Sequence, residues 1–285
     1  FLLIAAPLVD VILLNFFIYT GRWIRFSTPA YDLTVWLVNG IYSIFYLVSA
    51  LYFGIYGNKK FSGRYSLYAA LTAAIFASAF TYFFRDMQTL QLIQRDILPV
   101  IRSYRYINIW DAGCAHGPEP YSLAIMLREK MSHMLFRNVH IHATDVDACD
   151  QFGRTIAAGA YPEGEIKRIP GEIRSKYFTK TDQSHSYEIT DEIKSRVSFV
   201  KHDLLSLEPV RTGFSLIVCK NVLLHFDLRQ QVNVVEMFHS ALREGGFLVT
   251  EHTQKLPAEA EDLFERLTNE GQIFRKLQVG AHGGL

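Results

Sequence analysis

From Tyr106 onward, short apolar runs alternate with segments of helical periodicity, and this pattern constrains the fold more than any other feature. Strands that alternate with helices of this length predict an α/β, doubly wound sheet of the Rossmann-like type. Such a sheet binds its ligand beyond the carboxyl ends of the strands. We predict strands at 107–111, 139–144, 214–220, 247–251 and 272–277, and helices at 118–131, 147–158, 227–242 and 258–268.

Polar groups follow three of these predicted strands. Gly113 and Gly117 come after the first strand, and glycine lets a ligand approach the backbone closely. Their spacing is not that of a dinucleotide fingerprint, and no Walker lysine follows, so a phosphate ligand is poorly supported. Asp145 ends the second strand, where a carboxylate can accept both ribose hydroxyl protons. Asn221 follows the third strand, and its side-chain amide can form hydrogen bonds with an adenine or an amino acid.

Each of these signals also has a purely structural interpretation. The glycine-rich segment can be a tight turn, Asp145 a helix cap, and Asn221 a cap for the turn that follows it. Their occurrence at three successive strand ends favours a nucleoside cofactor without phosphates. S-adenosylmethionine fits that description.

The charge balance excludes other classes of protein. The 285 residues carry 29 Lys and Arg against 28 Asp and Glu, without a basic tract, which argues against a nucleic-acid partner. Three cysteines, Cys114, Cys149 and Cys219, have no metal-type spacing, so we expect neither a metal site nor a disulfide framework. A reducing compartment is the natural place for this half of the chain.

The first 84 residues carry only seven charged side chains, with a net charge of +3. Residues 1–20 and 31–56 are apolar runs long enough to cross a bilayer, and Tyr and Trp lie near their ends. Two spans place Lys59, Lys60 and Arg64 on the side of the second half, which predicts an inner-membrane protein with that half in the cytoplasm. The stretch 65–84 is either a third span or a connecting helix. A buried helical hairpin in a soluble cytoplasmic protein or dimer is the alternative.

Several motifs of the second half occur together in one known family. The motifs are Phe80-Thr-Tyr-Phe-Phe-Arg-Asp86, Asp111-Ala-Gly-Cys-Ala-His-Gly-Pro-Glu-Pro-Tyr-Ser-Leu-Ala124, Ala143-Thr-Asp-Val-Asp147, Gly159-Ala-Tyr-Pro162, His202-Asp-Leu-Leu205 and Cys219-Lys-Asn-Val-Leu-Leu-His-Phe-Asp227. In this order they resemble the catalytic domain of CheR-type chemoreceptor glutamate O-methyltransferases, over roughly residues 80–255. The resemblance divides the chain into an apolar helical segment, 1–79, and an S-adenosylmethionine-dependent methyltransferase domain, 80–285.

The resemblance also implies roles for individual residues. Arg85 and His225 would be catalytic, with Arg85 orienting the substrate carboxylate and His225 close to the transferred methyl group. Glu119 would hold the methionine end of the cofactor and Asp145 its ribose. The remaining implied cofactor contacts are Thr81, Arg85, Gly113, Ala115, Gly117, Asp203 with Leu204, and Asn221 with Val222.

This chain departs from the family pattern at four positions. Asp203 and Ala79 stand where Asn is usual, His225 where Tyr is usual, and Lys220 where Arg is common. The family also has a polar N-terminal helical domain, in whose place this chain has apolar runs. A small hairpin, 187–190 with 197–200, would match the inserted β-subdomain of the family.

The resemblance implies methyl transfer from S-adenosylmethionine to a glutamate carboxylate of a protein, a chemoreceptor or related signalling protein, which leaves S-adenosylhomocysteine. Two alternatives stay open: a cofactor-binding regulator that has lost transfer, and a small-molecule carboxyl methyltransferase. The expected partners are the acceptor protein and, through the apolar helices, the membrane. A homodimer built from paired membrane hairpins is also compatible with the sequence.

Overall fold

The computed structural model describes residues 81–147, 150–181, 185–251 and 254–278. All of them belong to one unit, Ser78–Leu285. The predicted membrane helices, 1–20 and 31–56, lie outside the described residues, as do Ala79 and Cys149. Within the described ranges, no helix combines the length and the apolar character that a bilayer crossing needs.

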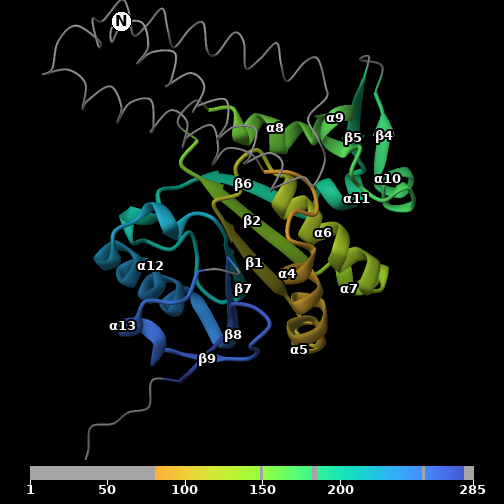
Figure 1. The fold of residues 1–285 in the computed structure, drawn as a ribbon. Coiled ribbons are helices and arrows are strands. Elements are labelled where there is room, and N and C mark those ends of the chain that lie inside the picture. Colours follow the sequence, from red (N-terminus) through yellow and green to blue (C-terminus); the bar gives the residue numbers. More distant parts are fainter. Residues whose placement is uncertain (1–80, 148–149, 182–184, 252–253, 279–285) are drawn as a thin grey trace, which may run out of the picture. The chain divides into compact units, whose positions relative to one another are not determined.

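A seven-stranded sheet forms the centre of the described unit (Figure 1). Its strands, numbered one to seven in chain order, lie in the order 3-2-1-4-5-7-6, and the seventh runs antiparallel to both of its neighbours. This order is that of the Rossmann-like class I methyltransferase fold, so the predicted doubly wound sheet is confirmed. The strands are β1 (Ile107–Ala112), β2 (Val139–Asp145), β6 (Val197–Lys201), β7 (Phe214–Cys219), β8 (Leu242–Thr250), β9 (Phe264–Arg266) and β10 (Ile273–Lys276).

Helices cover both faces of this sheet, and Figure 1 shows α6 and α12 on opposite sides of it. Alternate residues of β1 feed two cores: Ile107 and Ile109 pack on the α6 side, and Trp110 packs with Phe214 and Phe238 on the α12 side. The helices are α4 (Met87–Leu92), a π-helical turn (Ile93–Ile97), α5 (Leu98–Ile101), α6 (Pro118–Lys130), α7 (His133–Phe136), α8 (Phe152–Ala158), α9 (Glu163–Ile166), α10 (Gly171–Tyr177), α11 (Asp191–Lys194), α12 (Leu228–Ala241) and α13 (Ala258–Glu261), with 3₁₀ turns at Leu204–Ser206 and Leu223–His225.

A second, three-stranded antiparallel sheet is inserted between β2 and β6. It consists of β3 (Ala160–Pro162), β4 (Phe178–Lys180) and β5 (Ser186–Ile189), in the order β3-β5-β4. The predicted hairpin of 187–190 with 197–200 is wrong, because α11 redirects the chain after β5 and β6 joins β2 in the main sheet. The alternation of apolar and polar residues is the same for either pairing, so the sequence pattern alone did not separate them.

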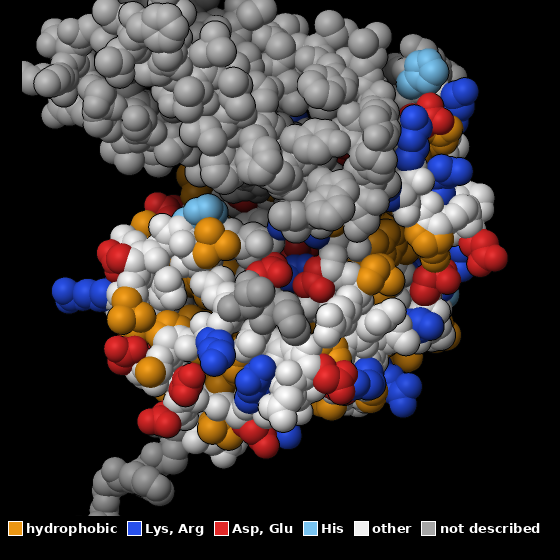
Figure 2. All heavy atoms as spheres, in the orientation of Figure 1, with side chains coloured by type: hydrophobic (Ala, Val, Ile, Leu, Met, Phe, Trp, Pro, Cys, Tyr) orange, Lys and Arg blue, Asp and Glu red, His pale blue; other side chains and the backbone are white. Residues whose placement is uncertain are grey.

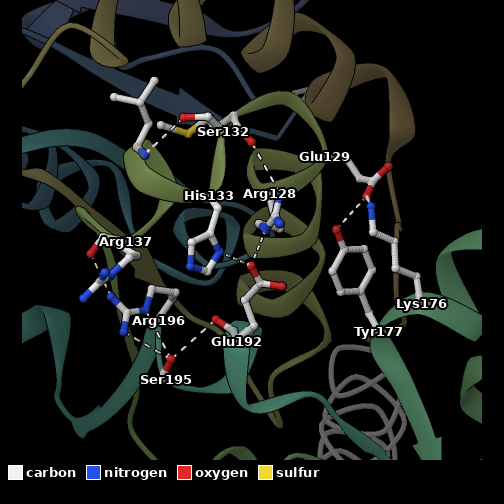
Figure 3. A network of polar contacts seen from close by, with 12 residues as sticks. Arg128, Glu129, Ser132, His133, Arg137, Lys176, Tyr177, Glu192, Ser195 and Arg196 are labelled. Carbon is white, nitrogen blue, oxygen red and sulfur yellow. Dashed lines mark hydrogen bonds and ion pairs between the residues drawn. The ribbon is translucent and has the colours of Figure 1, made fainter.

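Ion pairs attach this insert to α6 (Figure 3). Arg128 of α6 pairs with Glu192 of α11. The next residue of α6, Glu129, accepts hydrogen bonds from Lys176 Nζ and Tyr177 Oη of α10, both at 2.6 Å. The insert is therefore fixed to the helix that starts directly after the glycine-rich loop.

All four predicted helices have different bounds in the structure, and the helix predicted at 118–131 differs only in ending at Lys130. The helix predicted at 258–268 is wrong beyond Glu261, because Phe264–Arg266 pairs with β10 as an edge strand. The helix predicted at 147–158 begins at Phe152. The helix predicted at 227–242 begins after Asp227, which forms a capping box with Gln230, and it ends at Ala241, so the two glycines at 245–246 lie within β8.

Candidate functional site

The glycine-rich loop after β1 packs against the loop after β7. Gly113 has a φ of 102°, and a Cβ built on it lies 2.0 Å from Val222 Cγ2. Gly117 has a φ of 103°, and its Cβ lies 2.6 Å from both Ile156 Cγ1 and the Tyr161 hydroxyl. Both positions need glycine for conformation and for space. The first and third strand ends singled out in the sequence are therefore in contact.

Asp145 connects the second strand end to the same loop. Its Oδ2 accepts a hydrogen bond from the Ala115 N–H at 3.0 Å. The helix-capping role belongs instead to Asp147, whose carboxylate accepts from the N–H groups of Gln151, Phe152 and Gly153. Burial opposes ionisation of Asp147, but these three bonds hold its pKa below the usual range.

A buried ion pair lies beneath the loop. Lys220, directly after β7, has a side chain that is 4% exposed, and its Nζ lies 3.2 Å from Glu119 Oε2 and 3.9 Å from Asp86 Oδ2. Burial lowers the pKa of Lys220, but the carboxyl groups of Glu119, Asp86 and Asp111 outweigh it and raise that pKa above the usual value. Lys220 is therefore a cation enclosed by acids.

Glu119 occupies the first turn of α6, where the helix dipole favours a negative charge. Burial raises the pKa of its carboxyl group, and the charges of Lys220 and Arg85 act in the opposite direction without cancelling the shift. Glu251, which follows β8, adds a further rise. The charge of Arg85 thus acts on the Glu119 carboxyl.

The segment that carries Thr81 and Arg85 is held tightly. Phe83 is buried and makes edge-to-face ring contacts with Tyr161 and Phe178 of the insert, at 4.9 and 5.3 Å between centroids. The next residue, Phe84, donates its N–H to the Ser122 hydroxyl of α6 at 2.8 Å. Thr81 lies half-buried at the start of this segment. The segment is therefore anchored to both the insert and α6.

Asp111, near the end of β1, is 1% exposed, and neither of its carboxyl oxygens has a hydrogen-bond partner among the described residues. Burial and the charge of Glu119 raise its pKa well above the usual range, with a smaller rise from Asp145 and an opposing effect of Lys220. The sequence interpretation treated Asp111 only as the start of the glycine-rich loop. An acid near the end of a buried strand was the signal that could have identified it.

The remaining predicted residues differ in burial and in hydrogen-bond partners. Leu204 is buried in the core on the α12 side, and Asn221 is half-buried with a φ of 59°. Asp203 is exposed and caps the turn after it, accepting from the Leu205 N–H at 2.9 Å. His225 is exposed at the end of a 3₁₀ turn. Asp203 and His225 make no hydrogen bond or ion pair to the Glu119–Lys220 group within the described part of the chain.

The model of the CheR methyltransferase SAM-binding domain matches residues 79–273. The chain belongs to the CheR methyltransferase family. S-adenosylmethionine is therefore the cofactor of the matched domain. Buried acids and a loop of obligatory glycines fit this ligand, which carries a sulfonium and an ammonium and needs close backbone approach.

Curated relatives carry chemotaxis methyltransferase names. The chain is 32% identical to a chemotaxis protein methyltransferase of Borreliella burgdorferi, over 62% of this chain and 64% of that protein. It is 27% identical to a probable chemotaxis protein methyltransferase of Rhizobium etli, over 66% of this chain and 72% of that protein. Among solved structures, the N-methyltransferase NodS of Bradyrhizobium japonicum, in complex with S-adenosyl-L-homocysteine, has a TM-score of 0.39 at 17% identity, covering 68% and 91% of the two chains.

Proposed function

We propose that this chain transfers a methyl group from S-adenosylmethionine to a glutamate carboxylate of a protein, a chemoreceptor or a related signalling protein. The observation that carries the proposal is the joining of three strand ends: Gly113 packs on Val222, and the Ala115 N–H binds Asp145. The names of the relatives in Borreliella burgdorferi and Rhizobium etli support a chemotaxis substrate.

In this proposal, the cofactor supplies an electrophilic methyl group on a sulfonium. Asp145 accepts hydrogen bonds from the ribose hydroxyls, and Glu119 binds the ammonium of the methionine end. Thr81, Asp203, Leu204, Asn221 and Val222 surround the remainder of the cofactor, together with the loop of Gly113, Ala115 and Gly117. The obligatory glycines support close contact between that loop and the cofactor.

Methyl transfer to a carboxylate needs little acid–base chemistry, because the nucleophile is an anion at neutral pH and the leaving thioether is neutral. The protein must hold the two reactants in line and exclude water. Arg85 binds the substrate carboxylate through paired hydrogen bonds and so sets its direction of attack. His225, exposed on the turn after β7, contacts the incoming acidic side chain. Arg85 and His225 are therefore the two residues that we assign to the substrate.

The membrane attachment is a proposal from sequence alone. Residues 1–20 and 31–56 would span the inner membrane and hold the methyltransferase domain at its cytoplasmic side, close to membrane-bound receptors. Extraction of membranes at high pH tests this: the 285-residue chain should stay in the pellet. Recovery in the supernatant would contradict the attachment and favour the buried-hairpin alternative in a soluble protein.

The transfer itself can be tested with methyl-labelled S-adenosylmethionine and a receptor-containing membrane fraction. We expect label on a protein band, released as volatile methanol by mild base, because methyl esters hydrolyse readily. Asp145→Ala should lose this transfer, and Asp227→Ala, which alters only a helix cap, should keep it. Base-stable label would refute esterification of a carboxylate, and label on small molecules alone would indicate a small-molecule carboxyl methyltransferase.

A cofactor-binding regulator without transfer is the second candidate. The capping role and exposure of Asp203, together with the exposed His225 in place of the usual Tyr, favour it. Calorimetry with S-adenosylmethionine and S-adenosylhomocysteine, combined with the transfer assay, separates the two. Binding without any label transfer would identify the regulator, and absence of binding would exclude both candidates.

A further inference from the structure

A cavity of about 320 Å³ lies at the amino ends of the central strands, at the opposite end of the sheet from the glycine-rich loop. Asn108 is the second residue of β1 and lies opposite His140, the second residue of β2. Arg196 directly precedes β6, and Arg211 lies three residues before β7. Because Asn108 comes four residues before the end of β1, about 13 Å along the strand, the cavity is separate from the cofactor site.

Three arginines line this cavity, and none of the described lining residues is acidic. Arg137 and Arg196 lie next to each other (Figure 3), and the Arg196 guanidinium donates to the Arg137 carbonyl oxygen at 2.8 Å. Arg211 donates to Asn108 Oδ1 at 3.1 Å. These acceptors are neutral, so they do not compensate the charges of Arg196 and Arg211. The Arg137 guanidinium makes no hydrogen bond or ion pair within the described ranges.

The acids of the neighbouring helix α11 are paired elsewhere. Glu192 pairs with Arg128 and His133 (Figure 3), and Asp191 pairs with Lys194. An overall basic composition does not account for the three arginines, because residues 85–285 carry 24 Lys and Arg against 26 Asp and Glu. The positive charge at this cavity is therefore local.

His140 lies within reach of this positive charge. Burial lowers its pKa, and the charges of Arg196 and Arg211 lower it further. Like charges held close together repel one another, and the repulsion is stronger where protein excludes part of the water. An anion bound between the arginines would replace this repulsion with attraction.

We propose that this cavity binds the phosphate group of a small molecule, with Arg137, Arg196 and Arg211 as its binding residues. A phosphate monoester carries about two negative charges and three terminal oxygens, which guanidinium groups bind in pairs of hydrogen bonds. A carboxylate offers one charge and two oxygens, so three arginines match a phosphate better. The volume is at the lower end of the range for small-molecule sites, about 300–1,000 Å³, and therefore favours a small molecule over a macromolecule.

Tyr106 makes a mononucleotide a suitable probe. This residue lines the cavity and is 62% exposed, so its ring offers a surface on which a planar base can stack. Guanosine monophosphate differs from the cofactor in its base, and S-adenosylhomocysteine in excess keeps the cofactor site occupied. Calorimetry on the 285-residue chain then compares guanosine monophosphate, guanosine and inorganic phosphate. We expect the nucleotide to bind and guanosine, which lacks the phosphate, to give no measurable heat.

Inorganic phosphate separates the two sources of this ligand chemistry. Affinity equal to that of the nucleotide would indicate a site for free phosphate, and weaker affinity a site for a phosphorylated organic molecule. Either result supports a phosphate site. Binding of guanosine as tight as that of its monophosphate would overturn the proposal, because the phosphate would then contribute nothing.

Arg137→Gln tests the binding residues without disturbing the fold, because its guanidinium has no partner within the described ranges. We expect the Kd of guanosine monophosphate to rise about tenfold or more, since a hydrogen bond to a charged group is lost. Arg211→Gln should show a similar rise. The matched control is Arg229→Gln, which removes an exposed arginine of α12 and should change this Kd less than about twofold. Equal affinities of the three variants would overturn the proposal.

The wild-type chain provides an independent test. At fixed pH, guanosine monophosphate should shift the ring resonances of His140 and leave those of His185 in place, because the His185 side chain is 82% exposed on the insert. The absence of nucleotide binding, or of any shift at His140 on binding, would overturn the proposal.

Discussion

Replacing Lys220 with methionine tests the buried charge cluster most sharply. The substitution keeps a side chain of similar length but removes the one cation that lies 3.2 Å from Glu119 Oε2. At an effective dielectric constant of about 20, that pair alone interacts by about 5 kcal/mol, and desolvation of both ions offsets part of this energy. Removal of one partner from a buried pair destabilises proteins by about 3–5 kcal/mol. We therefore expect Lys220→Met to lower the free energy of unfolding by about 3 kcal/mol at pH 8.

The dependence of this loss on pH follows from the remaining acids. Without Lys220, the pKa values of Asp111 and Glu119, already raised by burial, have no nearby ammonium to lower them. A group whose pKa is raised in the folded protein is favourable while protonated, and its contribution is lost as the pH rises through the folded-state pKa. The destabilisation should therefore be smaller at pH 5.5 than at pH 8.

Urea unfolding followed by tryptophan fluorescence, to which buried Trp110 contributes, measures these differences. Lys220→Arg keeps the charge and serves as the control, with an expected loss below about 1.5 kcal/mol. The double variant Lys220→Met with Glu119→Gln should be more stable than Lys220→Met alone, since one unpaired acid is removed. A loss under about 0.5 kcal/mol for Lys220→Met at pH 8 would refute a buried, stabilising cation at this position.

Three further predictions concern the loop, the substrate and the middle of β2. Gly113→Ala should destabilise the chain by about 1–3 kcal/mol and weaken cofactor binding, because its Cβ lies 2.0 Å from Val222 Cγ2 at a φ of 102°; an unchanged Kd in calorimetry would contradict the close packing of the two loops. Arg85→Ala should abolish methyl transfer while thermal unfolding stays within a few degrees of wild type, and unchanged turnover would exclude its substrate role. Burial, together with His140 and Arg211, lowers the pKa of His142 to about 4, from an ordinary value of 6.5. The unfolded chain therefore binds the extra proton first, and the free energy of unfolding should fall as the pH drops from 6.5 to about 4. His142→Gln should reduce this slope in pH-dependent urea unfolding, and an identical slope in the variant would show that the fold does not lower the pKa of His142.

The central strands could be predicted from sequence because they are largely buried. β1 and β7 are mostly apolar, β2 alternates apolar residues with histidines, and the predicted ranges of all three differ from the observed ones by one residue at a single end. β6 and β9 lie at the two edges of the sheet and are short and partly exposed. Local patterns do not specify such edge strands, since their pairing is decided by the neighbouring strand.

Some residues of the candidate site could be identified from the sequence, and others could not. Asp145 and Asn221 were identifiable because each lies at the carboxyl end of a predicted strand, at the edge where ligands bind. The cluster around Lys220 was not, because Asp86, Glu119 and Lys220 come from three separate segments and only the tertiary fold places them together. Whether Asp111 has a partner depends on the same packing, and spacing along the chain carries no information about it.

The account places one cofactor at the joined ends of β1, β2 and β7, and a crystal structure with S-adenosylhomocysteine tests this most directly. We predict that the ribose hydroxyls bind Asp145 and that the ammonium binds Glu119. A ligand bound elsewhere on the sheet, or an ammonium that does not reach Glu119, would contradict the account.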